Sequence, residues 1–80
     1  MTIPDRITAR WIATLTNEEL QDAERELKGS FSQAESTEKA RRGAAYSLMR
    51  GPETLTSAWL RWSMVCNATR DRGLRTSYRS

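Results

Sequence analysis

Apolar residues recur along this chain with the period of an α-helix. In the first segment they are spaced four apart, and they are Ile3, Ile7, Trp11 and Leu15. This spacing keeps side chains on one helical face, whereas a strand needs strict alternation. Valine and isoleucine, which favour strands, are scarce. The pattern predicts an all-α protein whose first helix covers residues 4–14, with Pro4 in its first turn.

The start of the second helix carries the clearest local signal. Thr16 and Glu19 have the spacing of a capping box, in which each side chain bonds the backbone amide of the other residue. Leu15 and Leu20 flank this pair at the positions of a hydrophobic staple. We therefore expect a sharp turn near Leu15 and Thr16, with a helix beginning at Asn17.

The apolar stripe of the second segment keeps its phase as far as Met49. Its members are Leu20, Ala23, Leu27, Phe31, Ala34, Ala45, Leu48 and Met49. A constant phase favours one helix over residues 17–50, since a break would reset it. The alternative is a break near Gly29–Ser32, because glycine and serine are weak helix formers and Ser32 has the spacing to cap a new helix.

Gly51 and Pro52 end the second helix and open a third, expected over residues 52–72 with Gly73 as its C-terminal cap and Leu74 folded back on it. Short turns make successive helices antiparallel, which predicts an elongated antiparallel helical hairpin. We expect helix one along the first third of helix two, and helix three along the rest. Residues 1–74 form a single small domain on this prediction, and residues 75–80 form a flexible basic tail.

The third helix has two apolar faces. The inner stripe, expected to pack on helix two, is Leu55, Ala58, Trp59, Trp62, Val65, Cys66 and Thr69. Leu60 and Met64 lie one turn apart on the opposite face, followed by Ala68, and Ile12 is out of phase on helix one. These four residues are our candidate protein interface, the alternative being apolar residues scattered on the surface.

Composition removes most catalytic chemistry. The chain has 80 residues, no histidine and one cysteine. The commonest general base and metal ligand is therefore absent, and Cys66 alone makes neither an intramolecular disulfide nor a thiolate metal site. We expect no catalytic, cofactor or metal site and no enzyme activity. Without a signal-peptide or membrane-spanning pattern, a reducing cytoplasmic setting is expected.

Charge is segregated along the sequence. Residues 17–38 hold seven acids against two basic residues, while the part that follows is basic and the net charge is +3. One interpretation is a solvated face with pairs such as Glu35–Lys39 and Glu38–Arg42. Others are antiparallel self-pairing of the two halves, or phosphate binding. The candidate nucleic-acid contacts are Arg41, Arg42, Arg61, Arg70, Arg72 and Arg75.

A small rod-like chain buries little apolar surface, which favours association with another molecule. The sequence therefore predicts a non-enzymatic helical protein–protein interaction module, acting as an inhibitor, adaptor or assembly subunit. Its partner is another protein, a second copy of itself, or both. The less favoured alternative is a small basic protein that binds nucleic acid through its C-terminal half. Small, arginine-biased helical chains are typical of phage and plasmid accessory proteins, although no specific motif carries that impression.

Overall fold

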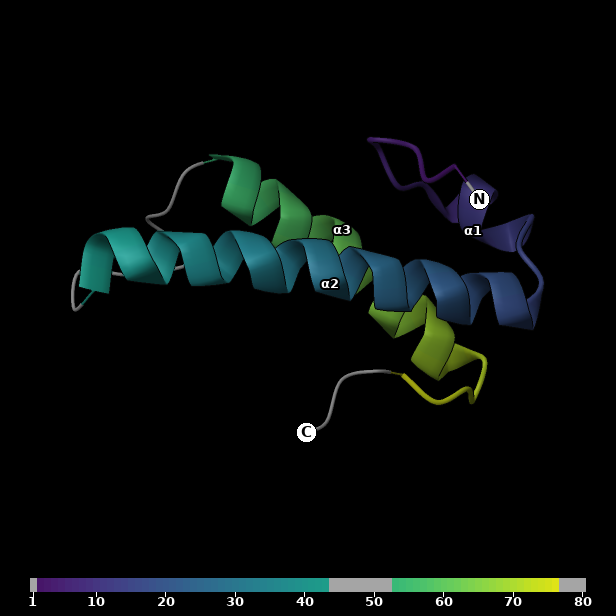
Figure 1. Ribbon diagram of the computed structural model, residues 1–80. Coiled ribbons are helices and arrows are strands. Elements are labelled where there is room, and N and C mark those ends of the chain that lie inside the picture. Colours follow the sequence, from purple (N-terminus) through teal and green to yellow (C-terminus); the bar gives the residue numbers. More distant parts are fainter. Residues whose placement is uncertain (1, 44–52, 77–80) are drawn as a thin grey trace.

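The computed structural model describes residues 2–43 and 53–76. This part of the chain contains no strand and three helices, α1 (Ala9–Ala13), α2 (Asn17–Arg42) and α3 (Glu53–Asp71). The two long helices pack on each other in opposite directions, so that the start of α2 lies beside the end of α3 (Figure 1). The molecule measures 40 × 25 × 19 Å. The all-α class and the elongated helical hairpin are thus confirmed.

The first helix is shorter than predicted. It begins at Ala9 rather than Pro4, because the Thr8 hydroxyl accepts a hydrogen bond from the Trp11 amide and caps it there. Pro4 lies outside the helix, and its carbonyl accepts from Arg61 Nη2 at 2.8 Å. The apolar stripe still marked the buried side correctly, since Ile7 is buried and its other members pack against the core.

The capping box is present as predicted. The Glu19 amide donates to Thr16 Oγ1 at 3.1 Å, and the Thr16 amide donates to Glu19 Oε1 at 2.9 Å. Two amides that the helix itself leaves without partners are satisfied in this way. The box fixes the start of α2 at Asn17.

Helix α2 runs through Gly29–Ser32 without a break, so the continuous alternative is confirmed there. It ends at Arg42 rather than at the predicted Arg50. Gly43 follows with φ of 54°, a left-handed value that suits glycine, and its amide donates to the Lys39 carbonyl. The predicted turn at Gly51–Pro52 and the stripe residues from Ala45 to Met49 lie outside the described residues.

The end of α3 follows the prediction closely. Gly73 adopts a φ of 74°, and its amide donates to the Arg70 carbonyl at 2.8 Å. The Leu74 amide folds back to the Thr69 carbonyl at 3.0 Å. These two bonds form a Schellman motif, which satisfies carbonyls that the last helical turn leaves open.

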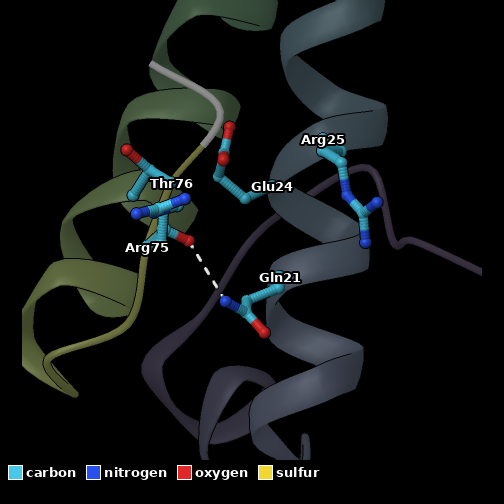
Figure 2. Close-up of a pocket in the computed structure, with 5 residues that line it drawn as sticks. All are labelled: Gln21, Glu24, Arg25, Arg75 and Thr76. Atoms are coloured by element: carbon cyan, nitrogen blue, oxygen red, sulfur yellow. Dashed lines mark hydrogen bonds between the residues drawn. The ribbon is translucent and has the colours of Figure 1, made fainter. Parts of the chain in front are cut away.

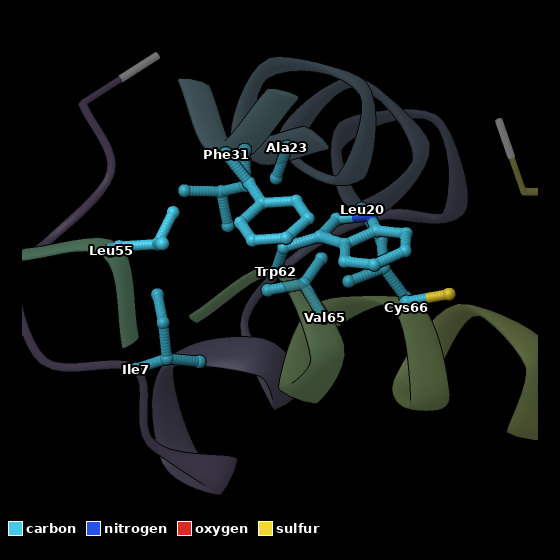
Figure 3. Close-up of a cluster of buried hydrophobic side chains, with 9 residues drawn as sticks. Ile7, Leu20, Ala23, Phe31, Leu55, Trp62, Val65 and Cys66 are labelled. Carbon is cyan, nitrogen blue, oxygen red and sulfur yellow. The ribbon is translucent and has the colours of Figure 1, made fainter. Parts of the chain in front are cut away.

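The core lies where α2, α3 and the N-terminal segment meet (Figure 3). Phe31 of α2 and Trp62 of α3 stack their rings with centroids 5.8 Å apart and planes 7° from parallel. Ile7 enters the cluster from the segment before α1. The buried apolar residues are Ile7, Leu20, Ala23, Leu27, Phe31, Leu55, Trp62, Val65 and Cys66.

The arrangement of the three segments differs from the prediction in one respect. Helix α3 reaches the very start of α2, where Arg72 bonds Asn17, instead of following only its last two thirds. Gln21 Nε2 also donates to the Arg75 carbonyl, so the chain just after α3 lies beside the first turns of α2. The N-terminal segment contacts α3 through the bond from Arg61 to Pro4, and its Ile7 enters the core that α2 and α3 share.

Candidate interaction surface

The outer face of α3 carries the large exposed apolar side chains of the described residues. Leu60 is 49% exposed and Met64 is 43% exposed, one helical turn apart. Uncharged polar residues surround them on the same side of the helix. We call the whole set the α3 strip, and it comprises Ser57, Leu60, Ser63, Met64 and Asn67.

The α3 strip contains no charge. Between Glu53 and Arg70 the helix has one charged residue, Arg61, and its guanidinium is held by the Pro4 carbonyl. The Ser63 hydroxyl donates to the Leu60 carbonyl at 3.1 Å, so this polar group already has a partner inside the helix. A protein that covers the strip would therefore bury neither a charge nor the Ser63 hydroxyl without a hydrogen-bonding partner.

The other two candidate interface residues lie elsewhere. Ile12 and Ala68 are half-buried, and both pack against the core cluster. The structure brings Leu60 and Met64 together on the outer face of α3, and it places Ile12 and Ala68 at the edge of the core. Periodicity could separate the two faces of α3, but it could not show that a neighbouring segment covers part of the second one.

Arg72 joins the end of α3 to the turn between α1 and α2. Its guanidinium donates to the Leu15 carbonyl at 2.9 Å, to Asn17 Oδ1 at 3.2 Å and to the Ile12 carbonyl at 3.0 Å. Carbonyls at the end of a helix have no partner within it, and a guanidinium fork suits several acceptors at once. This arginine, a candidate nucleic-acid contact by sequence, is occupied within the fold.

Arg41 and Arg42 are also engaged within the chain. Arg41 Nη1 lies 3.3 Å from Glu38 Oε1, and Arg42 Nε lies 3.0 Å from Glu38 Oε2. The Glu38 side chain is only 8% exposed, so the two pairs neutralise a nearly buried carboxylate. The predicted Glu38–Arg42 pair is confirmed, as is Glu35–Lys39 at 3.5 Å.

The six candidate arginines do not gather into one patch. Arg41 and Arg42 lie at the end of α2, whereas Arg72 and Arg75 lie beside its beginning, where Gln21 Nε2 donates to the Arg75 carbonyl at 3.2 Å. The exposed Arg70 belongs to the last turn of α3. The fold thus sets the basic end of α3 beside the acidic first turns of α2, so part of the segregated charge meets within one molecule.

A hollow of about 310 Å³ opens beside this junction (Figure 2). Its lining residues are Gln21, Glu24, Arg25, Arg75 and Thr76. The side chain of Glu24 is almost fully buried, and its Oε2 accepts from Trp62 Nε1 at 2.8 Å. Arg25 is paired with Asp22. Arg75 and Thr76, assigned by sequence to the tail, form one wall, while residues 77–80 lie outside the described part.

Glu24 is a buried acidic residue that the sequence pattern did not single out. The signal was its position, an acid inside the apolar stripe between Leu20 and Leu27. Its carboxylate satisfies the indole N–H of Trp62 in a place where an unpaired donor would be costly. The hollow supplies no activated nucleophile either, because burial raises the pKa of the neighbouring Cys66 thiol above its ordinary 9.0 and keeps it protonated at neutral pH.

Nowhere in residues 2–43 and 53–76 do three histidine, cysteine, aspartate or glutamate side chains gather as a metal site would need. Neither long helix, as far as it is described, combines the length and the hydropathy required to cross a membrane.

Comparison with known proteins adds no relative to this picture. A scan against models of protein families, a search of curated proteins and a search of solved structures each find no match.

Proposed function

We propose that this protein is a non-enzymatic helical interaction module that binds a partner protein through the α3 strip. The observation that carries the proposal is the exposure of Leu60 and Met64, 49% and 43%, on an uncharged helix face. It would serve as an inhibitor, adaptor or assembly subunit, in the manner of phage and plasmid accessory proteins. A reducing cytoplasm, in which the buried Cys66 thiol stays unpaired, is part of the same proposal.

Physical chemistry supports binding at this face. Removing apolar surface from water stabilises a complex by about 25 cal/mol per Å². Two large apolar side chains one turn apart are the kind of anchor that a helix presents to a groove or to another helix. The opposite side of α3 is fixed in the core through Trp62 and Val65, so the strip is held in place before a partner arrives.

The test is affinity capture from the native cell with the tagged full chain, after nuclease treatment. Three proteins are compared, namely the wild type, the double variant Leu60→Asp with Met64→Asp, and Gln33→Asp. Gln33 is an exposed residue of α2, so its substitution adds a negative charge away from the strip. We expect the wild type and Gln33→Asp to retain the same partner, and the double variant to lose it. Equal capture by all three proteins would contradict the proposal.

Nucleic-acid binding is the competing proposal, and it has less support. Arg41, Arg42, Arg61 and Arg72 already hold partners within the chain. An anisotropy titration against DNA and RNA at two salt concentrations separates the two proposals. Tight binding whose logarithm falls steeply with the logarithm of salt would favour nucleic acid, whereas absence of binding at low salt would remove it.

A further inference from the structure

We propose that the N-terminal part of the chain is a strap that opens as a unit and leaves the hairpin of α2 and α3 folded. The strap comprises residues 2–15, which are the irregular segment before α1, α1 itself and the turn that leads to α2. Its opening uncovers Arg61 and the part of the core that Ile7 contacts, so the strap is a conformational device built into the fold. This inference does not depend on the proposed function.

The strap packs less extensively than the two long helices do. Helix α1 has five residues, none of them buried, and its packing on the long helices is slight. Ile7 is the one buried apolar residue that the strap contributes, whereas α2 and α3 contribute the other eight. The remaining apolar side chains of the strap touch the core but stay partly exposed, and they are Ile3, Trp11, Ile12 and Leu15. Opening therefore exposes less apolar surface than unfolding of the hairpin does.

Two arginine side chains fasten the strap by hydrogen bonds. Arg61 Nη2 donates to the Pro4 carbonyl at 2.8 Å. Arg72 donates to the Leu15 carbonyl at 2.9 Å and to the Ile12 carbonyl at 3.0 Å. All three acceptors are backbone carbonyls, which water satisfies once the strap has opened. Opening therefore leaves no polar group of these three bonds without a partner.

The closed strap leaves a buried polar atom unsatisfied. Arg61 Nε is buried and has no hydrogen-bond partner among the described residues. A buried donor of a charged group that lacks a partner costs free energy, because it has given up its bonds to water. Opening gives water access to this guanidinium. The cost therefore belongs to the closed state and narrows the difference in free energy between the closed and open states.

The hairpin keeps its own contacts when the strap is open. The stack of Phe31 on Trp62 and the bond from Trp62 to Glu24 join α2 directly to α3. The start of α2 is capped within residues 16–19, so its cap needs no group from the strap. Thr16, the N-cap, has an extended backbone with φ of −69° and ψ of 166°. The junction just before Thr16 is therefore the hinge of the strap.

Native-state hydrogen exchange of the full chain, followed by NMR at low urea concentrations, tests the opening. A helix of five residues is not stable alone, so α1 unravels when the strap opens and its amides exchange. The reporters are the hydrogen-bonded amides of Trp11, Ile12 and Leu15, compared with those of Leu27 and Val65 within the long helices. We expect the three strap amides to share one protection factor, about 100-fold or more below that of the other two, and one weaker dependence on urea.

Two results of this experiment would overturn the inference. Equal protection and equal urea dependence at all five amides would mean that the chain opens only by complete unfolding. Unequal protection of the three strap amides, without any dependence on urea, would mean that α1 frays residue by residue and does not open as a unit.

The variant Ile7→Asp tests whether the strap detaches from a folded hairpin. Burial of a carboxylate in the core is costly, so the strap should remain open and its amides should lose protection. The amides of Leu27 and Val65 should stay protected, and most of the helical signal in circular dichroism should persist. Thr2→Asp, the control at an exposed position of the strap, should behave as the wild type. Loss of protection throughout the Ile7→Asp chain would contradict the inference, and so would a strap that stays protected.

Discussion

The two long helices share one core but present opposite outer faces to the solvent. Along α2 half of the exposed residues are charged, and several pair with a neighbour one turn away, as Arg25 does with Asp22 and Lys39 with Glu35. Along α3 the outer face is uncharged and centres on Leu60 and Met64. Charged groups on the outer face of α2 can be satisfied by water and by such local pairs. The outer face of α3 keeps two large apolar side chains in contact with water, which is why the proposed function lies there.

The inner faces show where the stability of the hairpin originates. Trp62 of α3 stacks on Phe31 and donates to the buried Glu24 carboxylate, both of which belong to α2. If the comparison is right, substitutions in this seam should unfold the chain, substitutions at helix ends should weaken it, and substitutions on the α3 strip should leave the monomer intact.

The largest effect is expected from Trp62→Ala. It removes the stacked ring and the donor to Glu24, and should lower the free energy of unfolding by about 3 to 5 kcal/mol. Urea denaturation followed by circular dichroism measures this. Trp62→Phe keeps an aromatic ring but loses the donor and part of the ring volume, so its cost should be smaller, about 1 to 3 kcal/mol. An unchanged unfolding curve for Trp62→Ala would show that the face of α3 that carries Trp62 is not the buried one.

Arg72→Ala should come next. It removes the bonds to the Ile12 and Leu15 carbonyls and to Asn17, at a cost of about 1 to 2 kcal/mol. Arg75→Ala is the matched control, because the bond from Gln21 uses only its backbone carbonyl, and its effect should stay within about 0.5 kcal/mol. Equal losses of unfolding free energy for Arg72→Ala and Arg75→Ala would show that the change in net charge, and not the hydrogen bonds of Arg72, causes the destabilisation.

Thr16→Ala should cost about 1 kcal/mol, since it removes the cap of α2. Thr37→Ala is the control within the same helix, where the hydroxyl only bonds the Gln33 carbonyl one turn back. Alanine has the higher helix propensity, so that variant should be neutral or slightly stabilised. Comparable losses in thermal melts of both variants would contradict the role of the cap.

The same cap predicts a pH dependence. Bonds from the Thr16 amide and then the Thr16 hydroxyl hold the pKa of the Glu19 carboxyl below its ordinary 4.5. The unfolded chain therefore binds this proton more tightly, so the contribution of Glu19 is present above that value and is lost as the pH falls through the lower folded pKa. The melting temperatures of the wild type and Glu19→Gln should converge with falling pH. A difference that is constant from about pH 7 to about pH 2 would refute this.

The smallest effect on the monomer is expected from Leu60→Asp. Its free energy of unfolding should change by less than about 1 kcal/mol, because the side chain is half exposed and lies outside the core cluster. Val65→Asp, on the buried side of the same helix, should unfold the chain. If urea denaturation shows similar losses of unfolding free energy for both variants, the assignment of one buried and one exposed face to α3 is wrong.

Much of the site was accessible from periodicity, and the missing part has a physical cause. The sequence pattern alone placed Leu60 and Met64 on the face of α3 opposite the inner stripe. It could not show that Ile12 and Ala68 lie at the edge of the core, nor that Arg61 and Arg72 bind backbone carbonyls. Those outcomes depend on which segment covers which face, and a single segment does not contain that information.

By itself the sequence determined whatever depends on residues within a turn or two of one another. The capping box of Thr16 and Glu19, the glycine end of α3 and the buried side of each helix are of this kind, because 3.6-residue periodicity and backbone capping are local. Only the tertiary structure decided the reach of α3 along α2 and the partner of Glu24. Trp62 and Glu24 are 38 positions apart, and Arg72 and Ile12 are 60 apart. Contacts over such distances form only once the packing of the helices has chosen which faces meet.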